Sequence, residues 1–138
     1  MMNVIKVIER ATLYDPTVVT LGATASELME GFNTSKTIPP LIEQDAWVGT
    51  ILQPEISRKI ESYINIELPY VAFKIKDIWQ EKDKIIGHIE ILDTEAGRFF
   101  KECHSGYCFV PRALVNPDDG KCLLITFDVR PRVFIPKK

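Results

Sequence analysis

The stretch from residue 84 to residue 115 constrains the fold most, because its local signals agree over the longest distance. It begins with an apolar run, Ile85 to Leu92, which is typical of a buried strand. Asp93-Thr94 then marks a helix start, and Tyr107 to Val115 follows the short helix as a second strand. We therefore expect a strand–helix–strand unit at the centre of the molecule.

A hairpin is predicted on each side of this unit. Pro69 to Trp79 alternates apolar and charged side chains, as a half-buried strand does, and residues 80–84 turn the chain into the strand that follows. After the second strand, Asn116-Pro-Asp-Asp-Gly120 predicts a turn into a last strand, Cys122 to Val129. The residues expected in the core are Val71, Phe73, Ile75, Ile89, Ile91, Phe109, Leu124 and Phe127.

The first half of the chain predicts shorter elements. These are strands at about 3–14, 17–21 and 47–52, a helix at about 25–30, and an amphipathic helix at 54–64. Thr24 and Glu27 fit a capping box, and Gly31 is a natural helix stop. Residues 32–46 contain Pro39-Pro40 and predict a long surface loop. Because turns join most successive strands, we predict an α+β fold: a mainly antiparallel sheet or a partly closed barrel with about three short peripheral helices.

Length and composition limit the classes of protein. At 138 residues the chain is expected to form one domain, residues 1–138. The formal net charge of −2 shows no basic excess, so nucleic acid is not expected as a partner. No apolar run reaches the roughly 18–20 residues that span a bilayer, and no signal-peptide core opens the chain. We therefore expect no membrane association and a cytoplasmic location, and the odd number of cysteines favours a reducing compartment.

Two groups of residues suggest chemistry without defining it. Cys103, His104 and Cys108 are close in sequence, but a structural zinc needs four ligands, usually from two close pairs. We expect free thiols, no metal and no cofactor. His88 with Ser105 or Cys103 is the combination that would make an atypical small hydrolase, because nucleophilic catalysis needs a base within hydrogen-bond reach.

Arg112 and Asp128 are the candidate binding residues. Each interrupts an otherwise apolar strand, in FVPRALV and LITFDVRPR. A guanidinium on a half-buried strand needs a partner, which an anion, a carbonyl or a carboxylate can supply. One alternative is that Arg112 faces water; we predict instead that Arg112 and Asp128 pair across neighbouring strands.

The segment GHIEILDTEAGRFFKECHSGYCFVPRALV resembles the core of the phage prohead proteases, which mature capsids. Arg112 matches the arginine that follows the serine of that family, and the likeness extends over residues 84–130. The other matching positions are Gly87, Ile89, Ile91, Leu92, Asp93, Thr94, Gly97 and the segment Phe127-Asp128-Val129.

The resemblance implies a protease-like core that has lost its catalytic residues. Val110 stands where the family places its serine, and residues 1–83, where the family has its histidine, contain none. A serine hydroxyl is not activated without a base. The resemblance therefore implies a non-catalytic phage-type protein, located in the host cytoplasm or the virion.

Its role would be in virion assembly or as a protein-binding module, with a phage capsid component or a host protein as partner. Self-association into a homo-oligomer stays open. The alternatives are the hydrolase described above and a module, unrelated to capsids, that binds a small molecule or a host protein.

Overall fold

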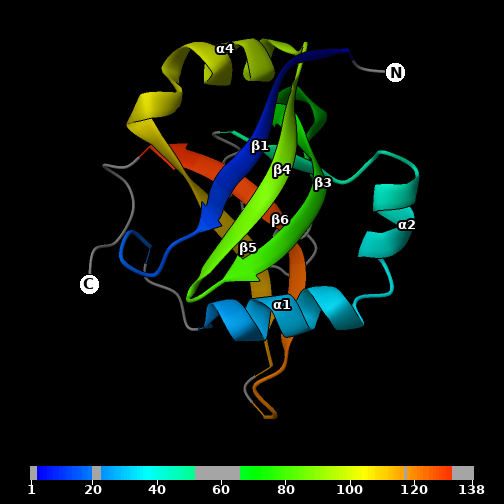
Figure 1. Cartoon of the computed structure of the whole chain (residues 1–138). Coiled ribbons are helices and arrows are strands. Elements are labelled where there is room, and N and C mark those ends of the chain that lie inside the picture. The colour runs from blue at the N-terminus through cyan, green and yellow to red at the C-terminus, as the bar shows by residue number, and fades with distance from the viewer. Residues whose placement is uncertain (1–2, 20–22, 52–65, 117, 132–138) are drawn as a thin grey trace.

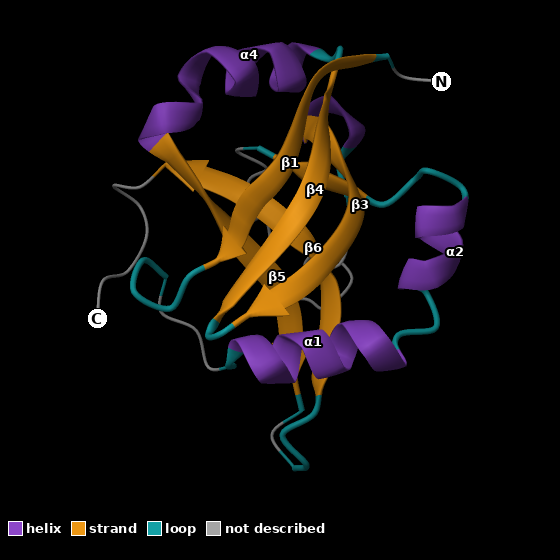
Figure 2. Cartoon of the chain, viewed as in Figure 1, coloured by secondary structure: helices purple, strands orange, loops and turns teal. Residues whose placement is uncertain are grey.

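The computed structural model describes residues 3–19, 23–51, 66–116 and 118–131, which form an α+β fold with two antiparallel sheets (Figures 1 and 2). The strands are β1 (Val4–Tyr14), β2 (Val48–Thr50), β3 (Val71–Glu81), β4 (Lys84–Leu92), β5 (Tyr107–Val115) and β6 (Cys122–Pro131). The helices are α1 (Ala25–Thr34), α2 (Ile38–Glu43) and α4 (Glu95–Cys103), with 3-10 turns η1 (Leu68–Tyr70) and η2 (His104–Gly106).

The larger sheet has the strand order β1-β4-β3-β2, and β5 and β6 form the smaller one. Figure 1 shows α1 crossing one end of the strands and α4 lying at the opposite end. The predicted fold class is confirmed in its antiparallel form, since neither sheet closes into a barrel within the described residues.

The central strand–helix–strand unit is present as β4, α4 and β5. Thr94 caps α4 by accepting a hydrogen bond from the Gly97 amide at 2.9 Å, and its hydroxyl donates to the Val71 carbonyl at 2.7 Å. The cap therefore also fixes the helix to β3. Gly97 allows this close packing, because a Cβ atom there would lie 2.0 Å from the Leu92 carbonyl oxygen.

The hairpin of β3 and β4 supplies much of the core. Its turn is shorter than the predicted 80–84, because Glu81 already pairs with Lys84. Among the predicted core residues only Phe109 is half-buried, and the other seven are buried. The Phe109 ring still packs edge-on against Phe73, with centroids 5.5 Å apart.

The capping box predicted for α1 is confirmed, but Gly31 does not end the helix, which continues to Thr34. A Cβ atom at Gly31 would lie 2.6 Å from the Cys122 carbonyl oxygen, so the glycine serves the close approach of α1 to β6. The loop predicted at 32–46 is also wrong, because α2 forms within it. Pro39 and Pro40 fall in the first turn of α2, where backbone amides have no intrahelical acceptor and a missing N–H costs little.

The strand predicted at 17–21 is wrong where the structure describes it. The Val18 and Val19 amides both donate to the Asp15 carbonyl at 3.0 Å, so the chain turns there instead of extending. The remaining residues of that prediction, and the amphipathic helix predicted at 54–64, lie outside the described residues.

Candidate functional site

The two candidate binding residues lie on adjacent strands, Arg112 on β5 and Asp128 on β6. They are diagonal neighbours, since Arg112 pairs with Thr126 and Asp128 pairs with Val110. Diagonal positions two residues apart share a face of the sheet and are within reach of a long side chain. The geometry therefore allows a direct contact.

Arg112 and Asp128 form a bidentate ion pair. The guanidinium donates from Nε to Oδ2 and from Nη2 to Oδ1, both at 2.7 Å. The residues are only 5% and 7% exposed, respectively. The predicted pairing is thus present, with both charges buried, whereas a role in binding a partner stays a prediction.

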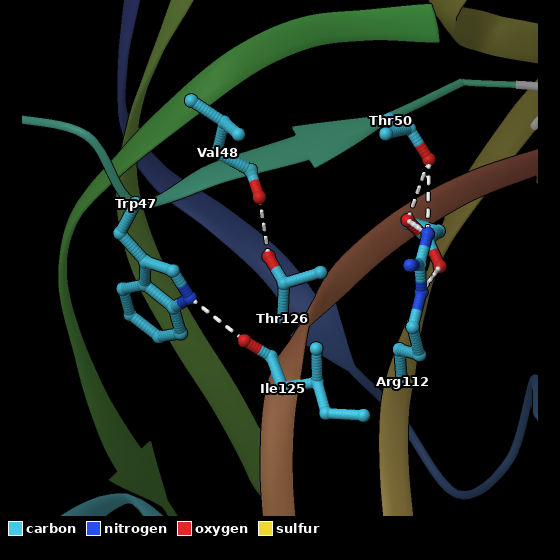
Figure 3. A network of polar contacts seen from close by, with 7 residues as sticks. Trp47, Val48, Thr50, Arg112, Ile125 and Thr126 are labelled. Carbon is cyan, nitrogen blue, oxygen red and sulfur yellow. Dashed lines mark hydrogen bonds and ion pairs between the residues drawn. The ribbon is translucent and has the colours of Figure 1, made fainter. Parts of the chain in front are cut away.

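Thr50 of β2 is a third member of this cluster that sequence reasoning missed. Its hydroxyl donates to Oδ1 of Asp128 at 2.7 Å, and Nη2 of Arg112 lies 3.3 Å from the same hydroxyl oxygen. Figure 3 shows the Thr50 hydroxyl directed toward the Arg112 guanidinium. We refer to Thr50, Arg112 and Asp128 together as the polar clasp.

Two further contacts join the larger sheet to β6 beside the polar clasp (Figure 3). The Trp47 indole donates from Nε1 to the Ile125 carbonyl at 2.9 Å, and the Thr126 hydroxyl donates to the Val48 carbonyl at 2.7 Å. Ile51, just after β2, forms a parallel bridge with Val129. These contacts connect β2 and its flanking residues to β6, and the polar clasp lies between the Thr126–Val48 hydrogen bond and the Ile51–Val129 bridge.

The polar clasp has the wrong geometry for nucleophilic catalysis. Thr50 is fully buried, so its hydroxyl cannot meet a substrate. Both carboxylate oxygens of Asp128 accept hydrogen bonds from Arg112, so the carboxylate is held as an ion-pair acceptor rather than presented as a base. What this arrangement can do is hold β2, β5 and β6 together.

The candidate hydrolase residues are not hydrogen-bonded to one another in the described structure. His88 lies on β4, with Asp77 of β3 opposite, and its Nε2 is buried without a hydrogen-bond partner in the described structure. Ser105 is exposed in η2, and Cys103 ends α4 half-buried. No hydrogen bond within the described residues joins His88 to either of them.

The described residues contain no group of three or more His, Cys, Asp or Glu side chains placed to hold a metal ion. No described helix has the length and apolar character that crossing a bilayer requires.

Comparison with solved structures gives a distant likeness. No family model and no curated protein matches the chain. Among solved structures, it is similar to the bacteriophage T4 capsid assembly protease, gp21, with a TM-score of 0.49 and 11% sequence identity over 95% of this chain and 90% of that one. The structural relationship is distant, so the function of this chain has to be argued from its own residues.

Proposed function

We propose that this chain is a non-catalytic protein-binding module that a phage uses in virion assembly. The observation that carries the non-catalytic part of the proposal is the polar clasp, which is closed on itself and buried. Nucleophilic catalysis needs a nucleophile, a base and access for the substrate at one place. Here the hydroxyl, the guanidinium and the carboxylate satisfy one another and connect three strands, which supports stability and not chemistry.

Val110 strengthens the non-catalytic side of the proposal. It lies on β5 directly opposite Asp128 and two residues before Arg112. In the sequence resemblance this is the position of the protease serine, and an isopropyl group there offers no nucleophile. The clasp residues Arg112 and Asp128 match the same family, which supports descent from a protease core with the chemistry removed.

The absence of a serine-type hydrolase is tested with a fluorophosphonate probe, which reacts only with an activated hydroxyl. We expect no labelling of the folded protein under conditions where an active serine protease is fully labelled. Wild-type labelling that disappears in Ser105→Ala or Thr50→Val would contradict the proposal and restore the hydrolase.

The binding side is tested with the capsid, scaffold and portal proteins encoded in the same genome. We expect the immobilised chain to retain at least one of these purified proteins and to ignore the capsid protein of an unrelated phage. If it retains none of them, or if no capsid genes lie near its own gene, the assembly role is wrong and a binding module unrelated to capsids is favoured.

A further inference from the structure

A constant spacing relates the residues that join β2 to β6. The Ile51–Val129 bridge and three side-chain hydrogen bonds all join residues 78 positions apart, the hydrogen bonds being Trp47–Ile125, Val48–Thr126 and Thr50–Asp128. Residues 47–51 therefore run parallel to residues 125–129 in a single register, and we refer to these two segments as the seam. Within the described residues the two backbones pair only at the Ile51 end. Side chains must therefore fix the register at the Trp47 end.

The Trp47 end of the seam coincides with an irregularity of β6. The register of β5 and β6 shifts between Arg112 and Ala113, which leaves Ile125 as an extra residue with no counterpart on β5. An extra residue decides on which face of the sheet the residues beyond it lie, because a shift of one position reverses every side chain. The polar clasp therefore forms only while the bulge lies between Arg112 and Asp128.

The Trp47 indole binds this extra residue directly, since its Nε1 donates to the Ile125 carbonyl at 2.9 Å (Figure 3). The indole is buried, stacks on Phe32 of α1 with ring centroids 5.6 Å apart, and meets Phe127 of β6 edge-on at 6.3 Å. The Trp47 carbonyl accepts a hydrogen bond from the Ile75 amide of β3 at 2.7 Å. The larger sheet and α1 therefore hold the indole N–H in place at the bulge.

We propose that the hydrogen bond from Trp47 to Ile125 is a register latch, a conformational device that decides whether the polar clasp is formed. While the latch is closed, the bulge stays at Ile125 and Asp128 shares a face with Arg112. When the latch opens, the Ile125 carbonyl loses its donor, β6 pairs with β5 in an unbroken ladder, and Asp128 turns to the other face. This proposal does not depend on the function proposed above.

The test removes the indole N–H and follows the register by NMR on the full chain. In Trp47→Phe we expect nuclear Overhauser contacts of Arg112 with Thr126, its partner in the bulged ladder, to give way to contacts with Ile125. We also expect the Arg112 Nε–H, which donates to Asp128, to exchange with solvent about 10-fold faster or more. Leaving a carbonyl without its donor is costly enough to raise the open population by that factor.

The matched control is Trp79→Phe, since the Trp79 indole also donates one hydrogen bond, to the Glu81 carboxylate at 2.8 Å, but lies on β3 outside the seam. It should leave the register and the exchange of Arg112 unchanged.

A second variant separates the hydrogen bond from the packing and decides the question even if Trp47→Phe does not fold. It carries 3-benzothienylalanine at position 47 in the Trp79→Phe background, so that a sulfur atom replaces the N–H while the ring system keeps its size. This variant should accelerate the same exchange. The proposal is overturned if either folded variant at position 47 keeps the wild-type register and exchange, or if Trp79→Phe alone accelerates the exchange as much.

Discussion

Removing the Asp128 carboxylate should destabilise the fold severely. In Asp128→Ala the buried Arg112 guanidinium loses both hydrogen bonds to the carboxylate, and the Thr50 hydroxyl loses its acceptor. Removing one partner of a buried ion pair costs about 3–5 kcal/mol, because the remaining charge is uncompensated. We expect the free energy of unfolding to fall by about that amount.

A double-mutant cycle isolates the interaction. Arg112→Ala should also be costly, but the double variant should cost about 0.5–3 kcal/mol less than the sum of the two single variants, as is usual for residues in direct contact. The pair of Arg98 and Asp93 is a matched control, since its ion pair has the same length of 2.7 Å while its side chains are 58% and 42% exposed. An exposed pair should show a coupling of only about 0–1 kcal/mol.

Urea unfolding followed by the intrinsic fluorescence of Trp47 and Trp79 measures these energies. Unchanged slopes with urea concentration would show that the variants differ in stability and not in compactness. The reasoning is refuted if the effects at Arg112 and Asp128 add within about 0.3–0.5 kcal/mol. It is also refuted if the exposed pair couples as strongly as the buried one.

Three further predictions follow from the packing and the charges. Phe73→Ala should lower the free energy of unfolding by about 3–5 kcal/mol, and Phe109→Ala by less, because only the Phe73 side chain is fully buried; urea midpoints that do not differ would contradict this. Gly97→Ala should lower the melting temperature although alanine favours helices, whereas Gly106→Ala, where a Cβ atom meets nothing within 4 Å, should leave it unchanged. Two lysines of β3 hold the pKa of Asp45 below its ordinary value of 3.8, so its contribution to stability is present above that pH and is lost as the pH falls through the lowered pKa. Asp45→Asn should therefore destabilise the fold at neutral pH and lose its effect in acid, and a pH-independent difference in thermal unfolding would contradict this.

The elements from residue 69 onward were predictable because their signals are local. Alternating side chains, a capped helix start and a strong turn sequence each act within a few residues, and the structure places β3 to β6 and α4 close to the predicted ranges. Helix α2 is missed because the effect of proline depends on its position in a helix. Pro39 and Pro40 predict a loop when proline is treated as a breaker of regular structure, but both fall in the first turn of α2, which tolerates proline.

Of the three residues of the polar clasp, Arg112 and Asp128 could be predicted from the sequence and Thr50 could not. A charge in an apolar strand demands a partner, which was enough to pair Arg112 with Asp128. Thr50 gave no such signal, because a threonine in a short strand is ordinary and its partners lie 62 and 78 positions along the chain. Only the tertiary arrangement of β2 against β6 brings its hydroxyl to the ion pair.

Even the successful pairing depends on a feature that the sequence does not show. Counted from the turn, Leu114 pairs with Leu123 and Ala113 with Leu124, so an unbroken ladder would place Arg112 opposite Ile125. Asp128 would then project from the other face of the sheet, because a shift of one residue reverses every side chain. The register shifts between Arg112 and Ala113, which brings Thr126 opposite Arg112 and returns Asp128 to the face of Arg112. The bulge at Ile125 is therefore what permits the ion pair, and deleting Ile125 should abolish the contact even though both charged residues remain.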